Sequence, residues 1–429
     1  MSRTSVPRHD VADLSLAGEG QARIEWAAGQ MPVLAQIRSR FERERPLDGV
    51  SAAACLHVTA ETACLMRTLQ SGGATVSLCS ANPLSAQDDV AAALVLADGV
   101  EVRARRGEST DEYVAHVLAL LAGGPQITLD DGADLLVTAH ARGGEPLQRL
   151  IGGTEETSTG LVRLRRLQQR GELRCPVLAV NEARTERALN DRHGTGQSAL
   201  DGIVRASNVL LAGLTIVIMG YGWAGQGVAE RARGAGGAVI VCEVDPLRAL
   251  EARMAGYEVM PALPAAERGD LFITVTGSRR VLRREHFERM KDGVLLANAG
   301  HFDVELDLAE LGELAGGDVR AVRPLVSEYR LADGRRLNLL AHGRVVKLAA
   351  AEGHPAAVMD VSFALQALAI EQLVVNAGSL GPGVHAVSPA VDREVGRLKL
   401  AALGVQIDEP TDEQTEYLSS WSAVGPSPS

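Results

Sequence analysis

The sequence predicts a two-domain α/β protein, and three observations support this prediction. The chain has 429 residues, which is more than one hydrophobic core holds, since domains commonly contain about 100–200 residues. Hydrophobic residues make up 46% of the chain and charged residues 23%, the proportions of a folded globular protein. Short apolar segments alternate with helix-length segments along most of the chain, which is typical of α/β domains.

The first domain is expected to run from Asp10 to about Arg184. Its short apolar segments end in turns, as in VSAAACLH (50–57), ATVSLCS (74–80) and ITLDDG (127–132). Such segments, separated by helical ones, predict short buried strands. The N-terminal part of the chain therefore has an α/β pattern.

The pattern changes near Asp201, where a second domain is expected to begin. The segment ALDGIVRASNVLLAG (199–213) predicts an amphipathic helix closed by Gly213. It is followed by LTIVIMG (214–220), a continuous apolar strand of the kind buried in parallel sheets. Further strands are predicted at 238–244, 271–277 and 293–300.

The C-terminal part is expected to leave the second domain after about His354. The apolar segment AAVMDVSFALQALAIEQLVV (356–375) predicts a long helix that returns to the first domain. The end of the chain, WSAVGPSPS (421–429), is rich in Pro, Ser and Gly. We therefore expect its last residues to be mobile.

A glycine motif directly follows the first strand of the second domain. Gly220, Gly222 and Gly225 form a G-x-G-x-x-G pattern that opens a helix, and such glycines allow a pyrophosphate to approach the start of that helix. Glu243 ends the next strand, about 20 residues on, where an acid binds ribose hydroxyls and repels a 2'-phosphate. The sequence therefore predicts a Rossmann domain that binds NAD rather than NADP, the alternative being a glycine turn that binds nothing.

Composition excludes several other classes of protein. The N-terminus has no apolar core for a signal peptide, and no apolar run is long enough to span a membrane, so we expect a cytoplasmic protein. The net charge of -11 argues against nucleic acid as a partner. The five cysteines are scattered without a C-x-x-C pair, which predicts reduced core residues and no metal site.

Several segments place polar residues densely among apolar ones, and together with the glycine motif they resemble the S-adenosylhomocysteine hydrolase family over nearly the whole chain. The segments are CLHVTAET (55–62), NPLSAQDD (82–89), LDDGADL (129–135), GGTEETSTG (152–160), ALDGIVRAS (199–207), GYGWAGQG (220–227), EVDP (243–246), GHFDVELD (300–307) and EGHPAAVMD (352–360).

The resemblance implies a Rossmann NAD-binding domain (197–352) inserted in a split α/β substrate-binding domain (1–184 and 354–388), followed by a C-terminal tail (389–429). It also implies an adenine nucleoside substrate and a tightly held NAD. In this family NAD oxidises the ribose 3'-hydroxyl to a ketone, which makes the 4'-hydrogen acidic. A base removes that hydrogen, the 5'-substituent leaves, water adds to the alkene, and the ketone is reduced again.

The resemblance also assigns roles to individual residues. His57 and Asp131 match acid–base positions near C4' and C5'. The other catalytic positions are Glu156, Glu186, Asn190, His301 and Lys347; the substrate contacts are Thr59, Glu61, Asn181 and His354; and the cofactor contacts are Thr157, Ser158, Thr159, Asp191, Gly220, Gly222, Gly225, Glu243, Thr276 and Asn298. For each residue taken singly, the alternative is a polar residue at a helix cap or domain boundary.

The chain departs from the family in the segment 181–202. The family has a lysine at Glu186, an aspartate at Asn190, an asparagine at Asp191 and a cysteine at Thr195, and its lysine and aspartate contact the 3'-hydroxyl. An asparagine of the family that contacts the nicotinamide is replaced by Lys347. We therefore consider the hypothesis that Glu186 and Lys347 face each other and exchange the roles of acid and base, against the alternative of an interdomain salt bridge.

The tail and the subunit number also depart from the resemblance. In the family, a C-terminal lysine and tyrosine reach the NAD site of a neighbouring subunit, whereas this chain ends TEYLSSWSAVGPSPS. We expect a homo-oligomer, either a dimer or a tetramer, that holds NAD less tightly. Trp223 and Gln226 replace an aspartate and a lysine of the glycine motif, which leaves the phosphate-binding backbone unchanged.

Three functions are compatible with these residues. The altered proton-transfer residues favour a dehydratase that stops after elimination and gives an unsaturated nucleoside, of the kind found among nucleoside antibiotics. The first alternative is an authentic S-adenosylhomocysteine hydrolase, which releases adenosine and homocysteine. The second is an NAD-binding regulator without activity, against which the retained His57, Asp131 and Glu156 argue.

Overall fold

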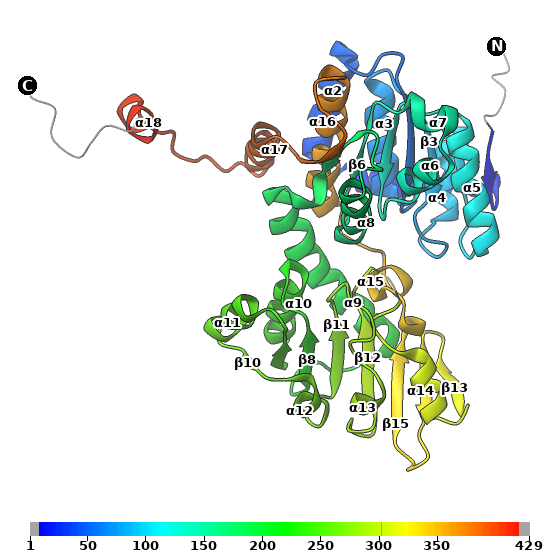
Figure 1. Cartoon of the computed structure of the whole chain (residues 1–429), viewed down its shortest axis with the longest axis vertical. Coiled ribbons are helices and arrows are strands. Elements are labelled where there is room, and N and C mark those ends of the chain that lie inside the picture. Colours follow the sequence, from blue (N-terminus) through cyan, green and yellow to red (C-terminus); the bar gives the residue numbers. More distant parts are fainter. Residues whose placement is uncertain (1–7, 302, 420–429) are drawn as a thin grey trace, which may run out of the picture.

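The computed structural model describes residues 8–301 and 303–419, which form two α/β domains (Figure 1). Each domain is built on one eight-stranded sheet. The predicted α/β fold class is therefore confirmed. The segment 421–429, for which we expect mobile residues, lies outside the described part of the chain.

The sheet of the first domain is parallel throughout, in the order β1-β4-β3-β2-β5-β6-β7-β16. Its last strand comes from the C-terminal part of the chain, so this sheet combines segments that flank the second domain in the sequence. The strands are β1 (Asp10–Val11), β2 (Ser51–Leu56), β3 (Thr75–Ser80), β4 (Glu101–Ala104), β5 (Ile127–Asp130), β6 (Gly152–Glu155), β7 (Pro176–Ala179) and β16 (Gly383–Ala386).

Both faces of this sheet are buried, which explains the continuous apolar runs in its strands. In β2, Ala52, Ala54 and Leu56 pack into the largest core, while Ala53 and Cys55 point to the opposite face and join a second core. Successive side chains of a strand alternate between faces. A strand with helices on both sides therefore needs apolar residues at every position.

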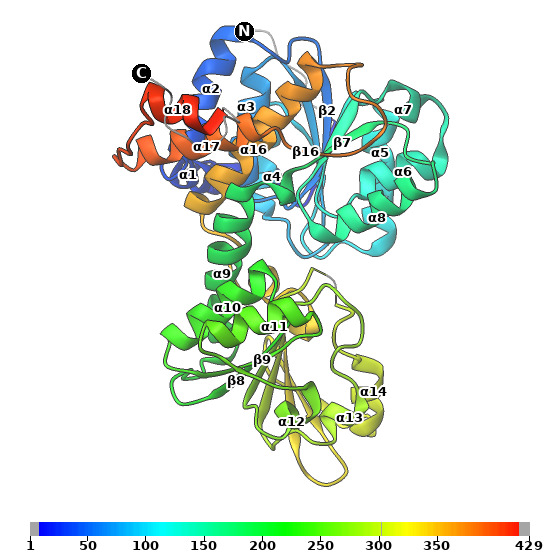
Figure 2. The same cartoon turned by 60° about the vertical axis from the view of Figure 1, so that its left-hand side comes forward.

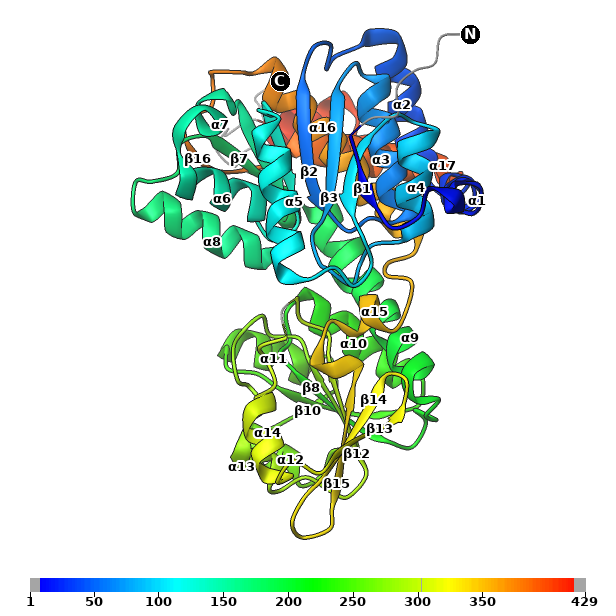
Figure 3. The same cartoon turned by 90° about the vertical axis from the view of Figure 1, so that its right-hand side faces the viewer.

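Helices cover the two faces of the first sheet (Figure 3). The first face carries η1 (Leu14–Leu16), α1 (Ala17–Ala28), α2 (Pro32–Glu44), α3 (Ala60–Ser71), α4 (Asp88–Leu96), α16 (Ala356–Val375) and α17 (Pro389–Ala402). The second face carries α5 (Thr110–Ala122), α6 (Asp134–Arg142), α7 (Gly144–Arg149) and α8 (Ser158–Gln169), and η2 (Val180–Glu182) follows β7.

The sheet of the second domain has the order β10-β9-β8-β11-β12-β15-β14-β13 and is parallel except at β14 and β13. Its strands are β8 (Thr215–Met219), β9 (Ala238–Cys242), β10 (Glu258–Val259), β11 (Leu271–Thr274), β12 (Val294–Asn298), β13 (Val319–Arg323), β14 (Val326–Arg330) and β15 (Arg336–Leu340). The four strands predicted in this domain correspond to β8, β9, β11 and β12.

The helices of the second domain include one whose predicted end is wrong. The amphipathic helix α9 ends at Ser207 because Asn208 adopts a left-handed conformation (φ 56°), so Gly213 does not close it. The domain contains α9 (Thr195–Ser207), α10 (Trp223–Gly234), α11 (Pro246–Met254), α12 (Ala262–Ala266), α13 (Arg284–Phe287), α14 (Leu308–Leu314), η4 (Ala341–Gly343) and α15 (Val346–Ala349).

Two segments connect the domains. The first is the π-helical segment η3 (Glu186–Gly194), which continues into α9 (Figure 2), and the second is the return from α15 to α16. π-Helical segments are rare and frequently occur at functional sites. Both connections bring predicted site residues to the boundary between the domains.

Helix α16 coincides with the predicted apolar segment 356–375 and packs in the first domain. By length and composition it is the one candidate membrane span among the described residues, but most of its apolar window is buried in the protein. It packs against α2, α3 and α17. Its uniform apolar character is explained by burial on nearly all sides.

Part of the predicted tail is docked on the first domain. Asp392 of α17 accepts hydrogen bonds from the backbone N–H groups of Arg184 and Thr185, and Lys399 pairs with the buried Asp360 at 2.9 Å. Residues 403–419, including α18 (Asp412–Ser419), are exposed. Residues 389–402 are thus held by specific contacts that composition does not reveal.

Candidate active site

A cavity of about 1250 Å³ lies between the two domains, and both domains line it. It contains nearly all of the predicted site residues, which are separated by up to 297 positions of the chain. The predicted residues on its wall are His57, Thr59, Glu61, Asp131, Glu156, Thr157, Ser158, Thr159, Asn181, Glu186, Asn190, Asp191, Gly220, Gly222, Glu243, Thr276, His301, Lys347 and His354. Gly225 and Asn298 do not line it.

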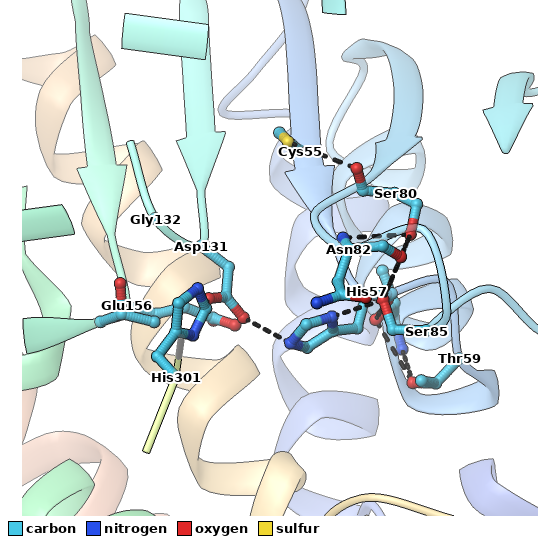
Figure 4. Close-up of polar contacts among 12 residues, drawn as sticks. Cys55, His57, Thr59, Ser80, Asn82, Ser85, Asp131, Gly132, Glu156 and His301 are labelled. Carbon is cyan, nitrogen blue, oxygen red and sulfur yellow. Dashed lines mark hydrogen bonds and ion pairs between the residues drawn. The ribbon is translucent and has the colours of Figure 1, made fainter. Parts of the chain in front are cut away.

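Three of these residues follow the carboxyl ends of neighbouring strands. His57, Asp131 and Glu156 come directly after β2, β5 and β6, which lie side by side in the first sheet. In parallel sheets the carboxyl ends of neighbouring strands meet at one edge, where ligands are commonly bound. The topology therefore brings together residues from three distant segments (Figure 4).

The imidazole of His57 is fixed on both sides. Its Nε2 lies 3.1 Å from Oδ2 of Asp131, and its Nδ1 lies 2.7 Å from the hydroxyl of Ser85. Nδ1 of His301, from the second domain, lies 3.6 Å from Oδ1 of Asp131. Figure 4 shows His57 and His301 on opposite sides of the Asp131 carboxylate.

The charge of Asp131 is stabilised by these histidines. Burial acts to raise the pKa of Asp131, but the positive charge of His57, its hydrogen bond and the charge of His301 outweigh burial and bring the pKa below its usual value. Oδ1 of Asp131 accepts no hydrogen bond from the described residues. A buried carboxylate oxygen of this kind is able to accept a proton or a hydrogen bond from a ligand.

Glu156 is held by a residue of the returning helix. Its Oε2 accepts a hydrogen bond of 2.9 Å from Nε2 of Gln366 in α16. Burial raises the pKa of Glu156 well above its usual value, and the charge of Asp131 adds to this effect. This shift favours the protonated form of Glu156.

Glu155 is a site residue that the sequence analysis did not identify. Its carboxylate is fully buried and accepts hydrogen bonds from the N–H groups of Gly132 and Thr157 at 3.0 and 2.8 Å, and from the Thr157 hydroxyl. It thereby joins the turn after Asp131 to the start of α8. The only signal in the sequence is the doubled acid at 155–156, which does not say which acid faces the cavity.

The hydroxyl residues 157–159 form the first turn of α8. Thr157 caps this helix by accepting a hydrogen bond from the Gly160 N–H, and the Ser158 hydroxyl donates to Oδ1 of Asn181 at 2.8 Å. Asn181 is buried. Ser158, a predicted cofactor contact, and Asn181, a predicted substrate contact, are thus hydrogen-bonded to each other.

Glu186 and Asn190 form one cluster with α16. The Ser362 hydroxyl lies 2.6 Å from both carboxylate oxygens of Glu186, and Nδ2 of Asn190 donates to the Ser362 oxygen at 2.8 Å. Burial raises the pKa of Glu186 to about 8, although the hydrogen bond with Ser362 opposes the shift. Burial also raises the pKa of the neighbouring Asp191 to about 6.

Lys347 belongs to a different cluster. Its Nζ lies 2.9 Å from Nε2 of His354 and 3.4 Å from the hydroxyl oxygen of Thr195. Both Glu186 and Lys347 line the cavity, but no salt bridge joins them in the described part of the chain, and each has other partners. The structure therefore does not show the direct pair of Glu186 and Lys347 that we consider from the sequence.

The remaining predicted substrate contacts lie around α3. Thr59 caps this helix through the Thr62 N–H, and Glu61 follows in its first turn. Burial raises the pKa of Glu61. The two residues face the same cavity as His354.

The glycine motif has the geometry that a dinucleotide requires. Gly220 adopts φ +102°, a conformation that disfavours other residues, and a Cβ on Gly225 would overlap the carbonyl oxygen of Gly220. Helix α10 begins at Trp223, and its N-cap Gly222 provides no side-chain hydrogen bond. The first N–H groups of α10 are therefore free to bind a pyrophosphate.

Around this turn, acids organise the backbone. Glu243 accepts hydrogen bonds from the N–H groups of Tyr221, Val244 and Asp245 at 2.7, 2.6 and 3.0 Å. The buried Glu305, which the sequence analysis did not identify, accepts from the Thr276 N–H and hydroxyl and from the Gly277 N–H.

Asn298 lies behind this wall, since its Nδ2 donates to the carbonyl of Gly343 and its Oδ1 accepts from the Gly300 N–H. We therefore attribute to Asn298 support of the cavity wall rather than direct contact.

Two family models match separate parts of the chain. Residues 8–145 match the model described as S-adenosyl-L-homocysteine hydrolase. Residues 191–353 match the model described as S-adenosyl-L-homocysteine hydrolase, NAD binding domain. The glycine turn described above lies in the second match, and the cofactor is therefore NAD.

Curated relatives match over almost the full length. An adenosylhomocysteinase of Aquifex aeolicus is 56% identical over 412 residues, covering 96% of this chain and 98% of the relative. An adenosylhomocysteinase of Thermosynechococcus vestitus is 54% identical, with 97% of each chain covered. An S-inosyl-L-homocysteine hydrolase of Methanopyrus kandleri is 52% identical, covering 96% of this chain and 97% of the relative.

Proposed function

The chain belongs to the S-adenosyl-L-homocysteine hydrolase family, and we propose that it is an NAD-dependent hydrolase that cleaves an S-nucleosyl-L-homocysteine into a nucleoside and homocysteine. The observation that supports this most strongly is the His57–Asp131 pair, which shares one cavity with the glycine turn of the NAD domain. The dehydratase, which the sequence favoured, becomes the second candidate because the relatives reported above are named as adenosylhomocysteinases and as an S-inosyl-L-homocysteine hydrolase.

Side chains of the first domain perform the acid–base steps in this proposal. NAD, when bound at the glycine turn, supplies the reversible oxidation of a sugar hydroxyl. The ketone makes the adjacent C–H acidic, and the pair of His57 and Asp131 accepts its proton, because Asp131 stays ionised and has an oxygen without a hydrogen-bond partner among the described residues. The same pair later activates the water that adds to the alkene.

The other polar residues hold the substrate in this proposal. Glu156, whose protonated form is favoured by burial, donates a hydrogen bond to a sugar oxygen. Thr59, Glu61 and His354 line the part of the cavity that receives the base. The relatives include enzymes named for adenosyl and for inosyl substrates. The assay therefore has to test substrates with each of these two nucleobases.

The decisive experiment is a product assay with purified protein and NAD. We expect S-adenosyl-L-homocysteine or S-inosyl-L-homocysteine to yield homocysteine, detected by a thiol reagent, together with the free nucleoside by mass spectrometry. Absence of thiol release from both substrates, with intact NAD binding, contradicts the hydrolase proposal.

The dehydratase remains as a second candidate because of one observation. Glu186 and Asn190, at positions where the resemblance implies a lysine and an aspartate, are engaged with Ser362, so the sugar hydroxyls meet different partners. A dehydratase would convert a nucleoside with a free 5'-hydroxyl into a product lighter by one water, about 18 mass units by its chemistry. The same mass spectra distinguish the two candidates.

We also propose a cytoplasmic location and a homo-oligomeric state. A cytoplasmic location is supported by the five cysteines, all of them free and buried, since disulfides are rare in that compartment. A homo-oligomer is our expectation from the resemblance, and sedimentation of the NAD-bound protein would test it.

A further inference from the structure

Lysine is exceptionally rare in this chain. Of its 43 basic residues, three are lysines, namely Lys291, Lys347 and Lys399. Arginine remains protonated in proteins, whereas the lysine amine loses its proton when its environment disfavours charge. A lysine in the cavity of this arginine-rich protein is therefore able to accept a proton, which arginine does not do.

The three lysines differ in their partners. Lys291 pairs with Asp270 at 2.8 Å and Lys399 with Asp360 at 2.9 Å. Lys347 forms no salt bridge in the described part of the chain, and its nearest polar neighbours are the imidazole of His354 and the hydroxyl of Thr195. Lys347 is thus the lysine without a carboxylate partner, and it lines the cavity between the domains.

Carboxylates surround Lys347 at longer range. Asp131, Asp191, Glu156 and Glu186 all line the same cavity and act on the charge of Lys347. In the described part of the chain none of them lies within salt-bridge distance of the amine, so Lys347 lines the cavity without a direct carboxylate partner. Burial lowers the pKa of Lys347 despite the acids, and it brings the pKa of His354 well below its usual value.

We propose that Lys347, held by His354 and Thr195, is the catalytic base that takes the proton from the sugar hydroxyl during its oxidation. In this step the O–H bond breaks and its proton adds to the lone pair of the amine in its unprotonated form. The C–H bond breaks, and the hydrogen with its electron pair passes to the oxidised nicotinamide dinucleotide. The C–O bond becomes a double bond. The proposal rests on the proposed function for the oxidation itself.

Glu186 is less suited to this step. The residue is 2% exposed, and its carboxyl group accepts a hydrogen bond from Ser362 and has a pKa of about 8, so the protonated form predominates at neutral pH. A protonated acid does not accept a second proton under these conditions. Burial shifts both groups toward their uncharged forms, and of these two forms the amine is the better proton acceptor.

The first test follows nicotinamide reduction in a single turnover after nucleoside is added to NAD-loaded protein. We expect Lys347→Met and Lys347→Arg to slow reduction by about 10²–10⁴-fold, the range of general-base catalysis. Nucleoside affinity should change less than about threefold, because binding does not require proton transfer. Lys291→Met is the matched control and should reduce NAD at the wild-type rate.

The second test measures the amine without catalysis. Brief acylation of the wild-type protein at a series of pH values, followed by peptide mass mapping, reports the titration of all three lysines separately. We expect Lys347 to become reactive at lower pH than Lys291 and Lys399. Equal or later reactivity of Lys347 overturns the proposal, as does wild-type reduction of NAD by folded Lys347→Met.

These outcomes can be distinguished from those of the product assay, which measures homocysteine release. Homocysteine release by the wild type, together with normal NAD reduction in Lys347→Met, would refute the role of Lys347 alone. If no homocysteine is released, the lysine titration and the reduction of NAD by nucleosides still test whether Lys347 is the base in the oxidation step. Loss of reduction in Glu186→Gln but not in Lys347→Met would assign the proton to Glu186 instead.

Discussion

At the scale of single residues, the site combines groups whose protonation is set by their surroundings. The two histidines favour the ionised form of Asp131, whereas burial favours the protonated forms of Glu156 and Glu186. Opposite shifts in neighbouring carboxyl groups are characteristic of acid–base sites. The charges of Asp131, which matches the family, and of Glu186, which departs from it, both act on Glu156.

Replacing the acid of the His57–Asp131 pair should separate two steps of the reaction. We expect Asp131→Asn to slow exchange of the sugar C–H with deuterated water by about 10²–10⁴-fold, since the amide is not a base. Reduction of NAD by nucleoside should persist, because it precedes that step. Mass spectrometry of the recovered nucleoside and nicotinamide absorbance measure the two steps, and loss of both to the same extent would contradict this assignment.

The buried Glu186 should make stability depend on pH. Its folded-state pKa of about 8 lies above the value of about 4.3 for an unfolded chain, so its contribution is fully present below the unfolded value and is lost as pH rises toward 8. Glu186→Gln lacks this titration. We expect the variant to gain stability relative to the wild type between pH 5 and 8.5 in urea unfolding, and a constant difference across that range would contradict the shift.

At the scale of elements, glycines allow the connection between the domains to pack closely. A Cβ on Gly227 of α10 would overlap the carbonyl of Arg192 in η3, and one on Gly196 would press on the backbone of Gly227. These contacts place η3, with Glu186 and Asn190, at a fixed distance from the helix that starts at the NAD site. The position of the site thus depends on residues without side chains.

Alanine substitutions within α10 should test this close contact. Gly227→Ala should lower the free energy of unfolding by about 1–3 kcal/mol, the usual cost of overpacking. Gly234→Ala, at the end of the same helix with no atom near its Cβ position, should be neutral or stabilising by about 0.4–1 kcal/mol. Thermal or urea unfolding measures both, and equal effects at the two positions would contradict the contact.

At the scale of the whole molecule, the active cavity exists only where the two domains meet. His57, Asp131 and Glu156 come from one sheet, while the glycine turn, His301 and Lys347 come from the other domain. The hydrogen bond from Gln366 in α16 to Glu156, which joins residues 210 positions apart, also holds the C-terminal part of the chain at the site. Ligands that bridge the domains should therefore stabilise the protein as a unit.

Removal and restoration of the cofactor should show this coupling. We expect NAD at a concentration of 100 times its Kd to stabilise the NAD-free protein by about 2.7 kcal/mol, seen as a higher Tm. NADP should have a much smaller effect, since Glu243 lies at the glycine turn and repels a 2'-phosphate. Equal shifts from both dinucleotides would contradict the role of Glu243.

The two parts of the C-terminal segment should differ in their contribution to the thermal stability of the first domain. Removal of residues 404–429 should leave the Tm of the first domain nearly unchanged, because the described residues among them are exposed. Removal of residues 389–429 should lower it, because the buried Asp360 then loses its partner Lys399 and an unpaired buried charge is costly. Calorimetry of both shortened chains measures the difference.

The sequence by itself determined the fold class, the NAD site and most members of the candidate site. Strands such as 214–220 and the helix 356–375 were identifiable because burial on both faces demands unbroken apolar runs, and the glycine motif because its backbone geometry excludes other residues. The family resemblance then indicated His57, Asp131 and their neighbours.

Only the tertiary structure decided the partners of these residues. It joined Glu186 to Ser362 and Lys347 to His354, revealed the supporting acids Glu155 and Glu305, placed Asn298 behind the cavity wall, and ended α9 at Ser207. Burial and hydrogen-bond pairing depend on which distant segments meet in space. That information is distributed over the whole chain, and no local pattern contains it.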